Sequence, residues 1–160
     1  MSQKNKSPNT PLKVLVDTSI IVDVDRGKQD VIELCKQLTS TNNAYISTVS
    51  VSEILTGSYL RKDHEKAVKK AEKILGQFRW VDLNGAVTKL VAELNAYLIA
   101  KEQPIEYQDV AIAACALLEN CDILLTENKE HFNRLPNLKN KVLTPKEFHQ
   151  KNNNKSPPQQ

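Results

Sequence analysis

The stretch Leu12-Lys13-Val14-Leu15-Val16-Asp17-Thr18-Ser19-Ile20-Ile21-Val22 joins two apolar runs through one acidic and two hydroxyl residues. The first run, residues 12–16, predicts a buried strand. The second predicts a helix that begins near Ser19 and stops before Gly27. Asp17 therefore stands where a strand ends and a helix starts. In a sheet of parallel strands such points gather at one edge, where ligands bind.

The same alternation of strand and helix continues along the chain. We expect further strands over residues 44–48, 80–83, 122–125 and 141–143, with helices over residues 30–38, 66–78, 84–101 and 107–119. A helix carrying Glu53 and a last short helix from Thr144-Pro145 complete the pattern. The helix over 107–119 is apolar nearly all round, which predicts a central, buried position. The alternation predicts a three-layer α/β/α fold with a central parallel sheet of about five strands.

More oxygen-bearing side chains stand at the edges of apolar runs. Glu53 lies just beyond residues 44–49, Asp109 heads the apolar stretch 110–118, and Thr126-Glu127-Asn128 follows Ile123-Leu124-Leu125. Three carboxylates brought together repel one another, and a cation relieves that repulsion. Ligands that are all oxygen favour Mg²⁺ or Mn²⁺ over softer metals.

Helix capping is the simpler explanation for each of these residues taken alone. Asp17 would cap the helix begun by Thr18, Ser50 and Glu53 would form a capping box, Asp109 would favour a helix dipole, and Asn128 would cap a short helix reaching Phe132. Capping, however, requires no fixed order along the sequence, and Ser or Thr serves it as well as a charged residue. The joint pattern therefore favours a metal site.

Four segments together resemble the PIN-domain ribonucleases, and in particular the VapC-type toxins of toxin–antitoxin pairs. They are Val16-Asp17-Thr18-Ser19, Ser52-Glu53-Ile54, Asp109-Val110-Ala111-Ile112-Ala113-Ala114 and Leu125-Thr126-Glu127-Asn128-Lys129-Glu130-His131-Phe132. The resemblance covers about residues 12–148. It implies the strand order 3-2-1-4-5. It also implies an acidic metal site made by Asp17, Glu53 and Asp109, with Ser19 and Thr126 at supporting polar positions.

The same resemblance implies an activity and partners. These are Mg²⁺-dependent endoribonuclease cleavage, with Mn²⁺ as a substitute ion, inhibition by a small antitoxin protein, and a homodimer. The apolar, weakly charged helices around residues 45–60 and 84–100 are the surfaces expected to meet protein partners. Asn128 is the expected fourth metal ligand, at a position where many PIN domains have an Asp, and His131 stands where an Asp often precedes the Phe. Glu127 and Glu130 are alternative sources of the missing charge, and spacing does not decide between them. The number of metal ions, one or two, stays open.

Composition sets the outer limits. The chain has 160 residues with 40% hydrophobic content, enough for one domain with a core. We expect this domain over residues 12–148, between disordered polar tails over residues 1–11 and 149–160. Four of the 22 basic residues lie in these tails, so residues 12–148 carry 18 basic and 19 acidic residues. The polar N-terminus and the lack of a long apolar run predict a cytoplasmic protein with no membrane contact.

Cysteines and cations carry weaker signals. Cys35, Cys115 and Cys121 lie among apolar neighbours without metal-binding spacing, so we expect buried, reduced thiols. Arg26, Arg61 and Lys62 are candidate contacts for an RNA backbone, although a solvated helix face also explains the last two.

Two other functions stay open. A nucleotide-binding or phosphatase-like domain is disfavoured because no Gly-rich loop follows the first strand and no second Asp stands at position 19. A catalytically silent PIN-like module that binds RNA or protein is the stronger alternative.

Overall fold

The computed structural model describes residues 10–153, and these residues build a five-stranded sheet in which every strand runs parallel to its neighbours. The spatial order is β3-β2-β1-β4-β5, which confirms the order implied by the resemblance. Leu15 of the central strand lies in register between Tyr45 and Leu124. The strands are β1 (Val14–Val16), β2 (Ala44–Ser47), β3 (Arg79–Val81), β4 (Ile123–Leu125) and β5 (Val142–Leu143).

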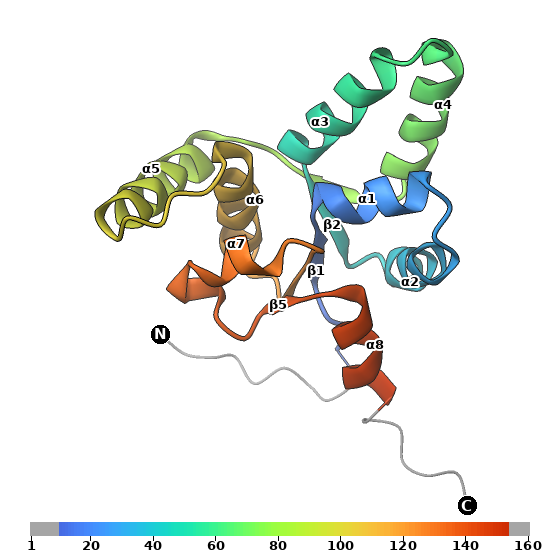
Figure 1. The fold of residues 1–160 in the computed structure, drawn as a ribbon. Helices are drawn as coiled ribbons and strands as arrows, with labels where there is room; N and C mark the ends of the chain where they lie inside the picture. The colour runs from blue at the N-terminus through green and yellow to red at the C-terminus, as the bar shows by residue number, and fades with distance from the viewer. Residues whose placement is uncertain (1–9, 154–160) are drawn as a thin grey trace, which may run out of the picture.

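Helices cover both faces of this sheet, as predicted (Figure 1). On one face lie α5 (Gly85–Ala100), α6 (Tyr107–Leu118) and α7 (Lys129–Asn133), followed by the 3₁₀ turn η1 (Pro136–Leu138). On the other lie α1 (Thr18–Asp25), α2 (Gln29–Ser40), α4 (His64–Leu75) and α8 (Pro145–Asn153). α3 (Thr48–Tyr59) pairs with α4, and the two project beyond the carboxyl edge of the sheet (Figure 1).

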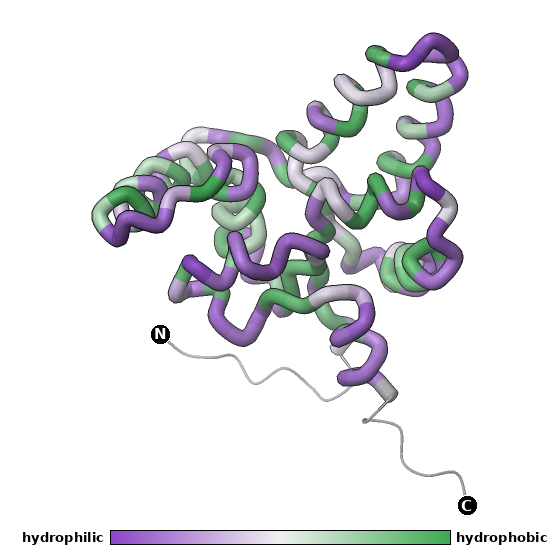
Figure 2. Tube along the Cα trace, in the orientation of Figure 1, coloured by the Kyte–Doolittle hydropathy of each residue, from purple (hydrophilic) through white to green (hydrophobic). Residues whose placement is uncertain are grey.

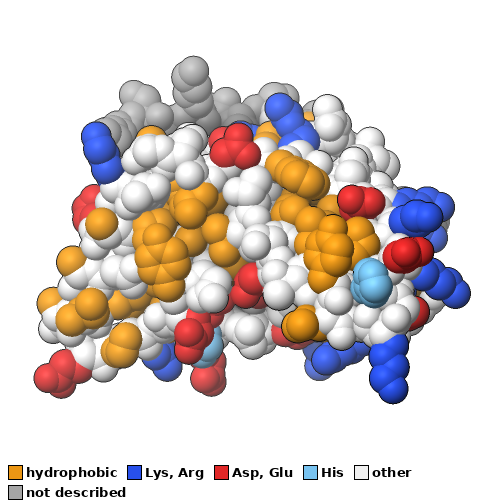
Figure 3. All heavy atoms as spheres, turned by 90° about the horizontal axis from the view of Figure 1, so that it is seen from above, with side chains coloured by type: hydrophobic (Ala, Val, Ile, Leu, Met, Phe, Trp, Pro, Cys, Tyr) orange, Lys and Arg blue, Asp and Glu red, His pale blue; other side chains and the backbone are white. Residues whose placement is uncertain are grey.

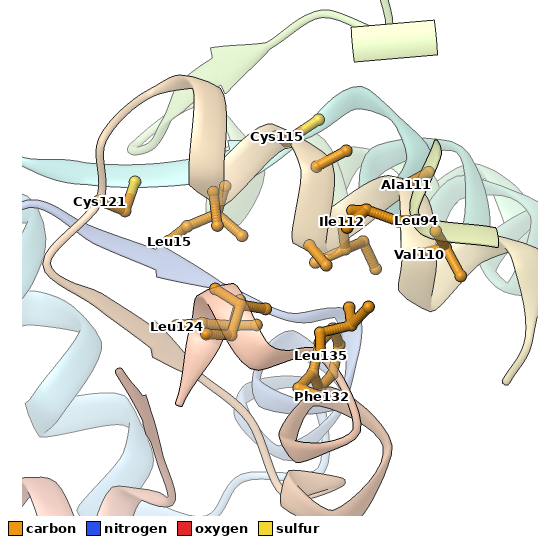
Figure 4. Close-up of a cluster of buried hydrophobic side chains, with 14 of the residues drawn as sticks. Leu15, Leu94, Val110, Ala111, Ile112, Cys115, Cys121, Leu124, Phe132 and Leu135 are labelled. Atoms are coloured by element: carbon orange, nitrogen blue, oxygen red, sulfur yellow. The ribbon is translucent and has the colours of Figure 1, made fainter. Parts of the chain in front are cut away.

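Alternate strand residues supply the two halves of the core. Leu15 and Leu124 point to the α5–α6 side, where they meet Ile112, Phe132 and Leu135 (Figure 4). Their chain neighbours, such as Val14, Val16, Ile123 and Leu125, join the cluster on the opposite face. Both sides of the central strands are therefore apolar, as expected for a parallel sheet covered on both faces. Along the trace, hydrophobic segments gather at the sheet and the inner helix turns (Figure 2).

The central position predicted for the helix over 107–119 is confirmed, since every side chain from Val110 to Ala116 is buried. All three cysteines are free and buried, as expected. Cys35 lies in the cluster with α1, α2 and α4, whereas Cys115 and Cys121 lie in the cluster with α5 and α6. Burial raises the pKa of Cys35 and Cys121 to about 12 and that of Cys115 to about 11.

Several element boundaries differ from the expected ones. α4 runs from His64 to Leu75, and Gly76 ends it before Phe78. The last helix continues past residue 148 to Asn153, although the C-terminal tail was expected to begin at 149. Thr144 and Glu147 explain its firm start, because each accepts a hydrogen bond from the other's backbone N–H. The rest of the expected tails, residues 1–9 and 154–160, lies outside the described residues. Between residues 10 and 153, no helix has the length and apolar character needed to cross a bilayer.

Candidate metal site at the carboxyl edge of the sheet

Asp17 is anchored at the centre of the sheet edge. Its backbone N–H donates to the carbonyl of Leu125 at 2.9 Å, which ties the end of β1 to the end of β4. The Asp17 side chain is 2% exposed and accepts three hydrogen bonds. Oδ1 accepts from the backbone N–H of Thr18 at 2.7 Å, while Oδ2 accepts from the hydroxyls of Ser19 and Thr126, both at 2.8 Å. Asp17 thus caps α1, as the simpler explanation proposed, and also faces the edge of the sheet.

The hydroxyls of Ser19 and Thr126 link this carboxylate to the backbone of the loop after β4. The Ser19 hydroxyl accepts from the backbone N–H of Glu127 at 3.1 Å, and the Thr126 hydroxyl accepts from that of Asn128 at 2.9 Å. Each hydroxyl thus accepts from a backbone N–H and donates its own hydrogen to Asp17 Oδ2, because an ionised carboxylate can only accept. Through these bonds the two residues fix the loop after β4 to Asp17 and to the start of α1.

Glu53 reaches the same edge from the second turn of α3. The capping-box explanation for this residue is wrong, because α3 begins at Thr48 and the Ser47 side chain caps it by accepting from the N–H of Ser50 at 3.1 Å. The strand ends earlier than the sequence suggested, so Ser50 already lies inside the helix. Glu53 Oε2 accepts instead from the Thr18 hydroxyl at 2.6 Å. This bond joins α3 to the first residue of α1.

Asp109 lies in the first turn of α6, as the dipole explanation requires, but its carboxylate has a specific partner. Oδ2 lies 2.7 Å from Nδ1 of His131 in α7. Asn128 occupies the N-cap position of α7, yet its side chain makes no capping hydrogen bond. The capping explanation is therefore wrong for the Asn128 side chain, whose amide faces the cavity described next.

Asp17, Glu53, Asp109, Asn128 and Ser19 all line one cavity of about 500 Å³. The fold therefore brings together in one cavity these residues, which are far apart along the chain and which the sequence analysis had grouped. The structure adds six further wall residues that sequence reasoning missed or used differently: Thr18, Val22, Asp23, Arg26, Lys28 and Glu127. Helical spacing could have revealed Asp23, which follows Ser19 by four residues and so shares its face of α1.

Electrostatics in this cavity disfavour negative charge. Burial is the main cause that raises the pKa of Asp17, and the nearby Asp109 raises it further, against the lowering effect of the Thr126 and Ser19 hydroxyls. Burial also raises the pKa of Glu53, the Thr18 hydroxyl lowers it, and Asp17 and Asp109 raise it. Ionised carboxylates held in this way are stabilised by a cation.

The donor set fits a hard divalent ion. Three carboxylates and one amide oxygen provide the all-oxygen ligands that Mg²⁺ and Mn²⁺ prefer. The carboxylates do not form a finished cage, since among residues 10–153 no group of three or more Asp, Glu, His or Cys side chains is arranged to hold a metal ion as it stands. Mg²⁺ suits such an open site because it keeps several of its own waters and bridges to phosphate.

The candidate RNA contacts are distributed unequally. Arg26, the C-cap residue of α1, lines both the acidic cavity and a neighbouring cavity between α1, α3 and α4. Arg61 lines only the neighbouring cavity and pairs with Asp25 and Asp63. Lys62 is exposed and borders none of these cavities. Lys28, which sequence reasoning missed, lines the acidic cavity and pairs with the buried Asp23 at 2.7 Å.

Comparison with known proteins shows which family this chain belongs to. The sequence pattern of the PIN domain matches residues 14–138, most of the chain. The chain belongs to the PIN-domain family. Ribonuclease VapC of Rickettsia bellii (strain RML369-C) is 31% identical to this PIN protein over 134 residues, which is 82% of this chain and 95% of that one. Ribonuclease VapC2 of Rickettsia felis (strain ATCC VR-1525 / URRWXCal2) is 28% identical over 125 residues, or 78% and 92%.

Solved structures support the same relationship. The Rickettsia felis VapBC2 complex bound to a promoter DNA fragment matches with a TM-score of 0.74 and 26% identity over 82% of this PIN chain and 97% of the other. The DNA-bound VapBC complex of Salmonella typhimurium matches with a TM-score of 0.75 over 84% and 99%, but at 20% identity it shows the shared fold alone. The resemblance stated from the sequence is therefore confirmed.

Proposed function

We propose that this PIN protein is an endoribonuclease that uses Mg²⁺, or Mn²⁺ in its place, to hydrolyse phosphodiester bonds in cytoplasmic RNA. The observation that carries the proposal is the convergence on one cavity of Asp17, which lies between β1 and α1, Glu53 of α3 and Asp109 of α6. These carboxylates would bind the ion, with Asn128 as a fourth, neutral ligand. The similarity to proteins named as VapC ribonucleases supports RNA as the substrate.

Several residues in or beside the cavity have roles that follow from their contacts. Ser19 and Thr126 hold the Asp17 carboxylate still, and Thr18 does the same for Glu53. Arg26 is placed to hold an RNA phosphate at the boundary of two cavities. A bound Mg²⁺ would supply polarisation of the phosphoryl group and easier ionisation of the attacking water. The neutral Asn128 reduces the negative charge of the site, which favours a single tightly held ion.

A cleavage assay tests the proposal directly. Mixed RNAs are incubated with the purified protein and either Mg²⁺, Mn²⁺ or a chelator, and fragment lengths are followed over time. We expect internal cuts with either metal and none with the chelator. Equal survival of RNA in all three tubes, at high protein concentration, would refute the proposal.

The alternative function is a catalytically silent PIN-like module that binds RNA or protein. It is favoured by Asn128 at the fourth position and by carboxylates that do not form a finished metal cage. A metal titration with labelled RNA separates the two functions. Binding of intact RNA, unchanged by Mn²⁺, would support the silent module, whereas metal-dependent cleavage supports the enzyme.

We also propose that the protein acts as a toxin held by a small antitoxin. Support comes from the VapBC2 complex of Rickettsia felis, to which this chain is 26% identical, and from the relatives named VapC. A cavity of about 220 Å³ next to the acidic one offers a place for antitoxin side chains, with apolar walls made by Ile21, Val22, Ile54, Ala71 and Ile74. An antitoxin segment seated there would pass Arg26 at the border of the metal site. Co-expression with a short neighbouring gene should lower nuclease activity and raise the mass of the purified particle.

A homodimer is the remaining part of the proposal. Hydrophobic side chains gather in two patches on one face of the molecule, over α3–α4 and over α5–α6 (Figure 3). Exposed apolar residues of these elements include Tyr59, Leu60, Ile99 and Tyr107, of which Leu60 is 83% exposed. Such exposure is unusual for a monomer and favours a protein partner. Light scattering should give twice the mass of the 18.0 kDa chain, and a monomer at all concentrations would refute the dimer.

A further inference from the structure

The hydrogen bond between His131 and Asp109 joins two helices at the metal site. Nδ1 of His131 lies 2.7 Å from Oδ2 of Asp109, and the two residues are 22 positions apart in the chain. An ionised carboxylate only accepts hydrogen bonds, so Nδ1 carries the hydrogen and donates it. Within residues 10–153, the other carboxylate oxygen, Oδ1, accepts no hydrogen bond. The contact therefore fixes the carboxylate and leaves one oxygen for a ligand.

The core holds His131 in place for this contact. The next residue, Phe132, is fully buried, and so is Leu135 one turn later. Both lie beside Ile112 and Val110 of α6 (Figure 4), the helix that begins with the turn containing Asp109. α7 is thus docked on α6 by apolar contacts, and the imidazole of His131 reaches Asp109 from a fixed backbone.

His131 itself stands beside the acidic cavity rather than in it. It does not line the 500 Å³ cavity that Asp109 lines, but a smaller neighbouring one of about 260 Å³ together with Glu127 and Asn128. Its side chain is 40% exposed, against 16% for that of Asp109. This position suits a group that acts on the metal through another residue.

We propose that His131 is a positioning residue for the metal site. Its Nδ1–H holds Asp109 in the orientation that presents Oδ1 to the cation. This inference rests on the metal-dependent function proposed above and adds a determinant of metal affinity to it. Hydrogen bonds to metal ligands typically contribute about 10- to 100-fold in affinity. The opposite role, in which His131 competes with the metal for Asp109, predicts the opposite sign.

The test measures Mn²⁺ binding to the full chain by calorimetry, without RNA and at one fixed pH. The informative variants are His131→Leu, which removes the donor, His131→Asn, whose amide nitrogen replaces Nδ1, and His131→Gln, whose amide lies one bond farther out. We expect Mn²⁺ affinity to fall about 10- to 100-fold for Leu and Gln and to stay near wild type for Asn. His64→Leu, at an exposed histidine at the start of α4, is the matched control and should bind as wild type.

The possible outcomes distinguish a failure of the positioning role of His131 from a failure of the proposed metal-dependent function. Wild-type protein that binds no Mn²⁺ would refute the metal-dependent function itself. Wild-type binding with His131→Leu equal or tighter would refute only the positioning role. If His131→Leu fails to fold, judged by its melting transition, the Asn and Gln pair decides. Equal Mn²⁺ affinities of that pair would overturn the inference, because a general structural role does not distinguish the two amides.

Discussion

Asp17→Asn is the variant that best separates a metal ligand from a helix cap. In the wild type, Oδ2 receives two hydroxyl hydrogens and Oδ1 receives one backbone N–H. An Asn amide can keep the two hydroxyl bonds only by turning its NH₂ to the N–H of Thr18, which removes the cap. Loss of an N-cap bond costs about 1 kcal/mol. Removing the buried charge acts in the opposite direction, because burial disfavours the ionised form of Asp17 and so raises its pKa. Without metal we therefore expect a melting temperature within about 3 °C of wild type.

Adding metal should produce a much larger difference. Mn²⁺ at 100 times its dissociation constant stabilises wild type by about 2.7 kcal/mol. For a domain of this size that corresponds to a rise of roughly 5–10 °C in melting temperature. If the lost ligand weakens binding about 100-fold, the same Mn²⁺ concentration stabilises Asp17→Asn by only about 0.4 kcal/mol. The shift should then fall to about 1 °C, and RNA cleavage should fall with it.

The assay is thermal melting with Mn²⁺ or chelator, with cleavage measured on the same samples. Asp122→Asn is the matched control, since Asp122 also accepts a backbone N–H, that of Lys13, at 2.9 Å. It precedes β4, at the opposite end of the strand from the cavity, and should keep the full metal shift. An Asp17→Asn protein that keeps the wild-type Mn²⁺ shift and still cuts RNA would reduce Asp17 to a helix cap.

Four further predictions follow from other contacts. Thr18→Val removes the hydroxyl that holds Glu53 and should weaken Mn²⁺ binding by about 10-fold or more in calorimetry, whereas Thr18→Ser should not. Metal-free stability should fall as pH rises through the folded-state pKa of Asp17, because that pKa is raised above its ordinary 3.8 and the folded chain binds the extra proton. Urea titrations from about pH 4 to 7 should show wild type losing stability relative to Asp17→Asn, and parallel curves would contradict this. Arg26→Gln should raise KM for RNA more than it lowers kcat, and an unchanged KM would exclude the phosphate contact. Glu147→Ala breaks the α8 capping pair and the bond to Lys129, so melting should drop about 2–4 °C with cleavage unchanged.

Local patterns predicted the fold because they act over short distances along the chain. The apolar run before Asp17 and the one ending at Leu125 predicted the two central strands, which are hydrogen-bonded neighbours. Helix periodicity likewise predicted a buried α6. Boundaries were less predictable: Ser50 was expected to cap a helix that in fact starts at Thr48, because β2 ends at Ser47.

The acidic residues of the site were predictable for a similar reason. Each follows or precedes an apolar run, and parallel topology carries such positions to one edge. Their partners were not predictable from spacing, since Thr18–Glu53 and His131–Asp109 depend on how helices pack across the edge. The pairing of Lys28 with Asp23 depends on the turn at Gly27, whose φ is +82°.

The three cysteines divide between the two sides of the sheet, so their rates of chemical labelling report how often each side opens to solvent. Thiol reagents attack the thiolate, and burial raises the pKa of all three thiols far above neutral pH. Each thiol is therefore labelled only after local unfolding exposes it to solvent. A chain that keeps only Cys35 reports on the layer of α1, α2 and α4, and one that keeps only Cys115 reports on the layer of α5 and α6. If an antitoxin binds and stabilises one side, the rate of thiol labelling on that side should fall while the rate on the other side stays unchanged.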